Sequence, residues 1–341
     1  MSTKIWNPDM EFFDMPMGIA RSVADGAREF MAVLIRLSCL PALVRWVQAR
    51  NKVTIVLYHD PAPEIFEKHL AYLSRRYNFI ALSDLVGAIR TGDWRAIRPY
   101  SIVLTFDDGH VGNYRLLPLI KKYGVRPTIY LCSGISDTNR KFWFKALKDP
   151  KLIQTLKECP ADIKQKIMQD HCGFSAQREY PESERQALNK LELHKMMESC
   201  DFGSHSQFHP TLTILSNQDC TREIADSKGE LFTMLNRECE HFAFPNGDYA
   251  ERELAIVKDA GYLSARTIDA GWNDMDTDPY RLRITGVSDT ASVNMLMVQL
   301  SGISMFVRYA LKRCFDGRSP KIARGINPPV IPSRQSDRET F

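Results

Sequence analysis

Ser101-Ile-Val-Leu-Thr-Phe-Asp-Asp-Gly109 is the stretch of sequence that decides the fold. Its first six residues form a short, mostly apolar run, which is typical of a buried β-strand. Two aspartates and a glycine follow directly, and this combination commonly ends a strand in a turn. Acidic side chains at this point also fit catalysis, because the active sites of α/β proteins lie at the carboxyl ends of parallel strands.

Similar runs recur on both sides of this stretch and alternate with helical patterns. The strand-like runs are residues 53–58, 101–106, 127–131, 201–203, 240–244 and 262–267. Apolar residues at helical spacing lie between them, at 64–76 and 114–123. This alternation predicts an α/β fold with a parallel sheet or barrel and right-handed crossovers.

The α/β pattern is flanked and interrupted by segments of other character. We expect an N-terminal helical extension over 1–50, a barrel over 51–290 with a polar helical insertion at 136–200, an amphipathic helix over 291–316 and a disordered basic tail over 317–341. The amphipathic helix either covers the core or lies on a membrane surface, and contact with a membrane would then involve residues 295–324.

Composition and charge exclude several classes of protein. The chain has 341 residues, 44% apolar and 25% charged, which is typical of a globular protein. Its net charge of +4 is too small for a dedicated nucleic-acid binder, so we expect no nucleic-acid partner. The eight cysteines form no CxxC pair, which argues against a zinc ribbon. The N-terminus shows no secretory signal and no transmembrane helix is evident, so a cytoplasmic location is expected, with peripheral membrane association as the alternative.

Residues suited to chemistry follow several of the strand runs. His59-Asp60 follows the first run, and Asn246-Gly-Asp248 follows the run at 240–244. His205 and His209 are four residues apart, so both imidazoles can reach one metal ion, although surface histidines would show the same spacing. A carboxylate from another strand end would complete a set of two histidines and one aspartate that leaves positions open for water and substrate.

These residues resemble the polysaccharide deacetylases of the NodB-homology type (carbohydrate esterase family four). Thr105–Gly109 is similar to the first motif of that family, Ser204–Pro210 to the second, Phe244–Gly247 to a degenerate third and Asp269–Trp272 to a degenerate fourth. The resemblance covers roughly residues 51–290. It implies a distorted (β/α) barrel, a divalent metal that is commonly zinc, and hydrolysis of an N-acetyl group on an amino sugar in a glycan.

The resemblance also implies a role for each matching residue. Asp107 would be the general base, and Asp108, His205 and His209 would be the metal ligands. The backbone N–H of Asn246 would bind the oxyanion. Trp272 would wall the acetyl methyl group, with a place in the core as its alternative.

Two functional residues of the family pattern are missing at their usual positions in this sequence. The third motif of the family opens with an arginine that orients the base, but this position is Ala243, and Arg281 or Arg283 is expected to replace it. The C-terminal motif with a general-acid histidine is absent. Tyr58-His59 resembles the circularly permuted subgroup typified by poly-N-acetylglucosamine deacetylases, in which a histidine on the first strand supplies the acid. His110 is the rival for this role.

The predicted chemistry is amide hydrolysis. A metal can lower the pKa of bound water to about 7 and polarise the carbonyl, while Asp107 takes a proton and His59 protonates the leaving nitrogen. The substrate could be a polysaccharide, an oligosaccharide or a lipid- or nucleotide-linked saccharide. Two alternatives remain open, a sugar N-deformylase on the same scaffold and a non-catalytic carbohydrate-binding relative.

Overall fold

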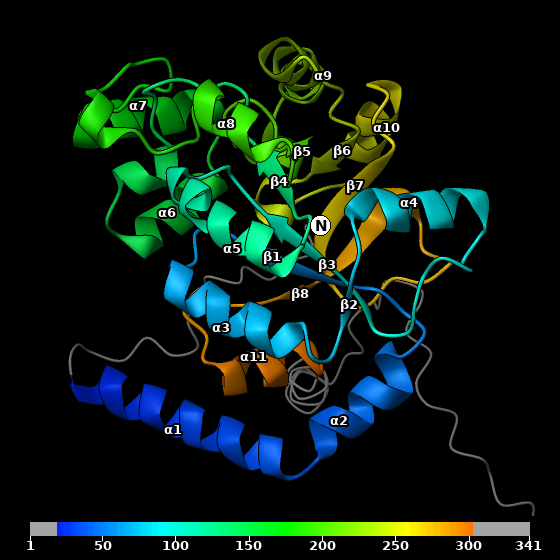
Figure 1. Cartoon of the computed structure of the whole chain (residues 1–341). Coiled ribbons are helices and arrows are strands. Elements are labelled where there is room, and N and C mark those ends of the chain that lie inside the picture. Colours follow the sequence, from blue (N-terminus) through cyan, green and yellow to red (C-terminus); the bar gives the residue numbers. More distant parts are fainter. Residues whose placement is uncertain (1–18, 303–341) are drawn as a thin grey trace, which may run out of the picture. The chain divides into compact units, whose positions relative to one another are not determined.

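The computed structural model describes residues 19–302, with side chains from residue 26 onward. Its centre is a parallel sheet whose first and last members meet (Figure 1). The strands that close the ring are β1 (Thr54–Tyr58), β3 (Ser101–Phe106), β4 (Thr128–Leu131), β5 (Asp201–Ser204), β6 (His241–Ala243), β7 (Ser264–Ala270) and β8 (Leu282–Gly286). The ring closes because β1 pairs with both β8 and β3. This confirms the predicted distorted (β/α) barrel.

Both faces of the barrel strands are buried, which explains their nearly continuous apolar sequence. Ile55 and Leu57 of β1 share one cluster with Tyr130 of β4, inside the ring. Val56 and Tyr58 face outward, into a second cluster under the helices. The short strand β2 (Asn78–Phe79) adds a pairing at the start of β3.

Helices cover the outside of the ring. They are α3 (Pro63–Leu73), α5 (Leu117–Tyr123), α9 (Asn217–Leu235), α10 (Glu251–Asp259) and α11 (Val293–Leu300). The buried side chains of α4 (Leu82–Thr91) instead belong to the cluster that holds Ile55 and Leu57. Leu296 and Leu300 of α11 are fully or almost fully buried in the core cluster that also holds Phe66 and Leu70 of α3. Val298 is also buried. In the described part of 295–324, these three apolar side chains are therefore not available to a membrane, and residues 303–341 lie outside the described part of the chain.

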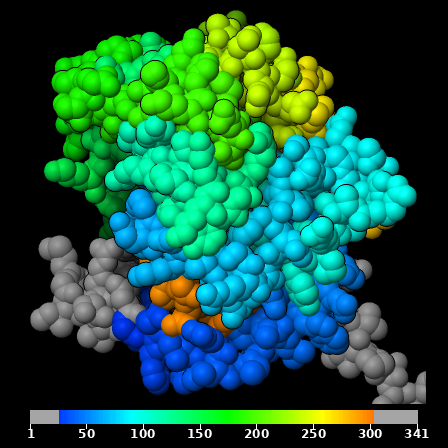
Figure 2. Space-filling model, in the orientation of Figure 1, coloured from blue at the N-terminus to red at the C-terminus, as the bar shows by residue number. Residues whose placement is uncertain are grey.

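The N-terminal extension consists of α1 (Ile19–Leu37), α2 (Leu40–Val44) and the π-helical turn η1 (Arg45–Ala49). Glu29 of α1 accepts hydrogen bonds from Ser292 and Asn294 at the start of α11. Figure 2 shows α11, in orange, enclosed between these blue helices and the cyan residues of α3. Within residues 19–302 no single helix is long and apolar enough to span a membrane. The bent pair Gly26–Leu37 and Leu40–Ala49 has, taken together, the length and composition of a broken membrane span.

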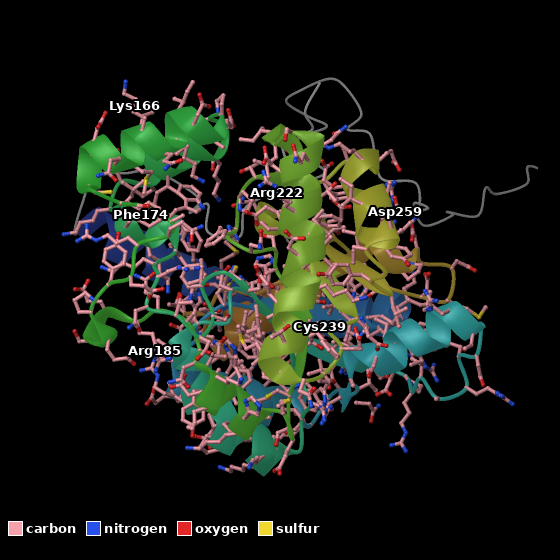
Figure 3. The ribbon with its side chains drawn as sticks, turned by 90° about the horizontal axis from the view of Figure 1, so that it is seen from above. Lys166, Phe174, Arg185, Arg222, Cys239 and Asp259 are labelled. Atoms are coloured by element: carbon pink, nitrogen blue, oxygen red, sulfur yellow. The ribbon has the colours of Figure 1, made fainter. Side chains whose placement is uncertain are left out.

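The insertion lies between β4 and β5. Its helices are η3 (Trp143–Ala146), α6 (Pro150–Lys157), α7 (Ala161–Cys172), η4 (Glu182–Glu184) and α8 (Lys190–Met196). It has a small core of its own, which includes Trp143 and Phe174. Figure 3 shows α7, with Lys166 labelled, and Phe174 to one side of α9, which carries Arg222. The insertion touches the barrel rim, because the indole N–H of Trp143 donates to the carbonyl oxygen of His209 at 3.0 Å.

Candidate active site

The residues singled out after the strand runs lie at one rim of the barrel. All ring strands are parallel, so their carboxyl ends point to the same side. Tyr58 of β1 is paired with Phe106 of β3, and the N–H of Asp107 donates to the carbonyl oxygen of Tyr58 at 3.0 Å. His59 and Asp107 therefore follow neighbouring strands at the same height.

Asp108, His205 and His209 form a buried cluster with one ligand atom from each residue within 4.8 Å of the others. Oδ1 of Asp108 lies 3.4 Å from Nε2 of His209 and 3.7 Å from Nε2 of His205. The three residues come from the ends of β3 and β5, so the fold assembles the set that the sequence predicted. A carboxylate and two imidazoles are a donor set suited to zinc with open coordination positions.

The hydrogen bonding of the cluster fits a metal ion. Oδ1 of Asp108 is buried and has no hydrogen-bond partner, although it faces two imidazoles. Nδ1 of His205 lies 2.8 Å from the carbonyl oxygen of Ala243, which assigns the proton to Nδ1 and leaves the Nε2 lone pair directed at the cluster. Burial lowers the pKa of His209 to about 3, so this imidazole is neutral at pH 7, as a metal ligand must be.

The loop that carries the two histidines is held in an unusual backbone conformation. Ser206 and His209 have φ values of 65° and 55°, in the left-handed region that costs free energy for residues other than glycine. Glu223 of α9 compensates, because one of its carboxylate oxygens accepts the N–H groups of Gln207 and Phe208 at 2.9 and 3.0 Å. Glu223 therefore fixes the backbone between the two histidines from outside the barrel. The Nε2 atoms of both imidazoles face Asp108.

Asp107 is held by an arginine that the sequence analysis did not select. Nη2 of Arg266 lies 2.5 Å from each carboxylate oxygen of Asp107, and Arg266 is fully buried. The expectation that Arg281 or Arg283 would take this position is wrong. Arg281 instead forms ion pairs with Glu251 and Asp278 at the surface.

Arg283 is placed elsewhere by its strand. It is the second residue of β8, and its Cδ packs against Gly271. The residue that does contact Asp107 lies on β7, where Arg266 is the direct register partner of Ala243 on β6. Paired residues on neighbouring strands present their side chains on the same face of a sheet. An arginine on β7 therefore takes the place that the family pattern gives to an arginine on β6.

The second oxygen of Asp108 is bound by His110, the rival candidate for the general acid. Nε2 of His110 lies 3.1 Å from Oδ2 of Asp108, and Nδ1 lies 3.0 Å from Nζ of Lys145. The ammonium can only donate, so Nδ1 accepts and the proton of His110 is assigned to Nε2, which faces Asp108. Both ring nitrogens are occupied, which makes His110 a support for Asp108.

Lys145 was missed because it lies in the polar insertion, on η3. Burial lowers its pKa, while Asp108, Asp60 and Asp289 oppose this effect. Burial would also raise the pKa of Asp108, but His209, His110 and His205 hold it well below its usual range. The carboxylate of Asp108 is therefore ionised at neutral pH.

His59 is fixed through its backbone. Its N–H and that of Asp60 donate to the two carboxylate oxygens of Asp289, at 3.1 and 2.8 Å. Its carbonyl oxygen accepts the side-chain amide of Asn113 at 2.7 Å. Three hydrogen bonds from two neighbours thus hold this turn at the rim, with His59 half-buried beside Asp107.

Asn246 and Trp272 have different positions relative to this rim. Asn246 follows β6, has a φ of 57° and donates through its side chain to Oγ1 of Thr211 at 3.4 Å, so it lies beside the histidine loop. Trp272 precedes Asn273, whose backbone pairs with Val53 just before β1 begins. The backbone thus places Trp272 near the opposite end of β1, and the expected acetyl wall is corrected to a buried tryptophan that is 9% exposed.

Comparison with known proteins agrees with this geometry. Residues 96–265 match the family model described as polysaccharide deacetylase. YxkH of Bacillus subtilis (strain 168), named as a polysaccharide deacetylase, is 22% identical over 255 residues, which cover 71% of this chain and 75% of that protein. Among solved structures, the deacetylase PplD of Streptococcus pyogenes in complex with acetate has a TM-score of 0.54 and 20% identity, covering 74% of this chain and 99% of that chain. IcaB from Ammonifex degensii has a TM-score of 0.52 and 17% identity, covering 74% and 98%. At these identities the structural matches support the fold.

Proposed function

This chain belongs to the polysaccharide deacetylase family, and from its rim residues we propose that it is a metal-dependent hydrolase that removes an N-acetyl group from an amino sugar of a glycan. The observation that carries the proposal is the buried cluster of Asp108, His205 and His209 directly beside the Asp107–Arg266 pair. Hydrolysis of an unactivated amide needs a metal ion and a general base beside it, and here the three candidate ligands lie next to a carboxylate that Arg266 orients. The Tyr58-His59 pair further suggests the circularly permuted subgroup.

Asp108, His205 and His209 would hold one divalent ion, for which zinc suits the ligands best. When bound, such an ion lowers the pKa of water and polarises the acyl carbonyl. Ala243 and His110 orient two of the ligands through the bonds described above, and this support of the ligands tunes affinity for the ion.

Asp107 would act as the general base, taking a proton from the water that attacks the acyl carbon. Its Oδ2 lies 3.7 Å from Nε2 of His205, so it borders the ligand cluster, and the buried guanidinium of Arg266 keeps it oriented. The backbone N–H of Asn246, on the neighbouring rim loop, would donate to the developing oxyanion. His59 would deliver a proton to the departing amine.

The role of His59 leads to a prediction. His59→Ala should keep the bound metal but reduce amide hydrolysis by roughly 10²–10⁴, the usual contribution of a positioned acid. Hydrolysis of an activated aryl ester should fall far less, because its leaving group needs little protonation. Steady-state rates on both substrates and metal analysis measure the three quantities. His110→Ala is the comparison variant and should instead weaken metal binding, because His110 supports the ligand Asp108. Equal losses on amide and ester for His59→Ala would remove His59 from proton transfer.

The proposal itself is tested by mass spectrometry of N-acyl sugars after incubation with the protein. Free, nucleotide-linked and polymeric N-acetylated and N-formylated substrates are each offered to zinc-loaded and chelator-treated enzyme. We expect loss of acetyl with the zinc-loaded protein only. Preferential loss of formyl would support the deformylase alternative. Tight glycan binding with no turnover under any metal would contradict the proposal and support a non-catalytic relative.

A further inference from the structure

Eight large apolar side chains are exposed on the N-terminal helices. They make up most of the exposed large apolar residues among those described, with exposed fractions of 44–71% for Phe30, Met31, Leu34, Leu37, Leu40, Leu43, Trp46 and Val47. Contiguous exposed apolar surface of this kind marks an interaction site in a folded protein. The other exposed large apolar residues in the described part of the chain are scattered singly over the insertion, the helix α9 and two loops after strands.

On α1 the exposed side chains share one face. Phe30, Leu34 and Leu37 follow the i, i+4, i+7 spacing of a single helical stripe. The opposite face is used within the protein, where Ala32 is buried and Arg36 donates to Asn294 of α11 at 2.7 Å.

The second arm, α2 and η1, repeats this arrangement. Leu40, Leu43 and Val47 follow the i, i+3, i+7 spacing and are exposed, whereas Pro41 and Ala49 are buried against the protein. Arg45 anchors this arm, because its guanidinium donates to the carbonyl oxygen of Arg76 at 2.9 Å and lies over the ring of Tyr100. Both arms are thus fastened to the domain by one face and leave the other apolar face uncovered.

The segment that carries this apolar face has charge of one sign. Residues 30–50 contain three arginines and no aspartate, glutamate or lysine. Trp46 lies close to Arg45 and Arg50, at the polar end of the surface, and tryptophan together with arginine is typical of segments placed at the headgroup level of a bilayer. Because Arg36 and Arg45 bond to the domain on the other face, the positive charge belongs to the segment as a whole, and a segment of net positive charge without acidic residues is complementary to anionic lipid headgroups.

We propose that the exposed face of α1, α2 and η1, defined by these eight side chains, is a docking surface for the interface of an anionic phospholipid bilayer. The helices lie in the plane of the interface with their apolar face among the upper acyl chains. They do not cross the membrane, because Ala32, Arg36, Arg45 and Ala49 engage the domain on the other face and lipid cannot surround the pair. This surface, over residues 30–47, is a different one from residues 295–324, which the sequence analysis named as the alternative to a helix that covers the core.

The test is vesicle flotation of the full-length protein. Vesicles of phosphatidylcholine with phosphatidylglycerol should carry the protein upward, and vesicles of phosphatidylcholine alone should carry much less. The double variant F30S/L37S should reduce partitioning onto the anionic vesicles by about tenfold or more, because burying one such side chain is worth about tenfold in an equilibrium constant. L43S/V47S should act in the same direction on the second arm.

The matched control is L191S/F232S, which removes two side chains of similar exposure (59% and 45%) from α8 and α9. It should float like the unaltered protein. Thermal unfolding and bound metal should be the same in all variants, since every substituted side chain is largely exposed. These readouts do not depend on deacetylation, so failure of the membrane proposal and failure of the proposed function are distinguishable.

Three results would overturn the proposal. One is no flotation of the intact protein with anionic vesicles. Another is equal flotation of F30S/L37S and the control variant. The third is a sedimentation experiment in which F30S/L37S dissociates an oligomer while lipid binding is absent, because the surface would then join copies of this chain.

Discussion

Asp107→Asn is expected to leave the metal content of the protein nearly unchanged while lowering turnover by roughly 10²–10⁴, the usual contribution of a positioned base. An asparagine keeps the shape at the rim but cannot take a proton. Asp108→Ala is expected to lose metal and activity together, because Oδ1 of Asp108 is the atom that faces both imidazoles. Metal analysis of the purified variants and initial rates on an N-acetylated substrate measure both effects.

Asp248→Asn is the control for this pair, since it alters a rim carboxylate outside the ligand cluster. It should keep metal and retain turnover to within a few-fold. If Asp107→Asn strips the metal while Asp108→Ala retains it, the assignments of the two aspartates are reversed. If neither variant changes turnover, the site lies elsewhere.

Much of the fold could be predicted from local sequence. The run Ser101–Phe106 is apolar on both faces because the strand is buried on both faces, and the turn after it is marked by Asp107-Asp108-Gly109. The direction of parallel strands then places every such turn at one rim. Strand β2 was missed because two residues carry no periodicity, and β8 was missed because Arg283, Thr285 and Gly286 interrupt its short apolar pattern.

The ligand cluster could be predicted because its members follow strand ends, whereas the residues that support it could not. Arg266 lies in the middle of β7, where a strand pattern gives no reason to look for function. The register that pairs it with Ala243 depends on where β6 and β7 begin. Lys145 reaches His110 from the insertion, and such a contact exists only once the insertion has folded over the rim. One feature of the sequence could have identified Arg266. It is an arginine among small and apolar residues, within an otherwise buried strand.

Arg266→Ala is expected to have the largest combined effect on stability and activity. Removing the guanidinium leaves the Asp107 carboxylate buried without its partner, which costs about 3–5 kcal/mol in the free energy of unfolding. Asp107 also loses the contact that orients its carboxylate, and a carboxylate turned away from the attacking water cannot serve as base, so turnover should fall by roughly 10²–10⁴. Denaturant unfolding and initial rates measure the two losses. Arg281→Ala is the control, because its ion pairs are at the surface, and each loss should be small.

The double variant A243R/R266A tests whether the position of the arginine or only its charge is needed. Ala243 and Arg266 are direct partners across β6 and β7, so an arginine at 243 can extend into the space that the side chain at 266 vacates. The backbone carbonyl of residue 243, which orients His205, is unchanged by the substitution. We therefore expect the double variant to recover at least about tenfold of the lost turnover, together with part of the lost stability.

Full activity of Arg266→Ala, or losses in Arg281→Ala of equal size, would show that Asp107 does not depend on this arginine. Recovery of stability without any recovery of turnover would instead mean that a guanidinium on β6 neutralises Asp107 without orienting it, because charge compensation needs only proximity whereas proton transfer needs a fixed direction.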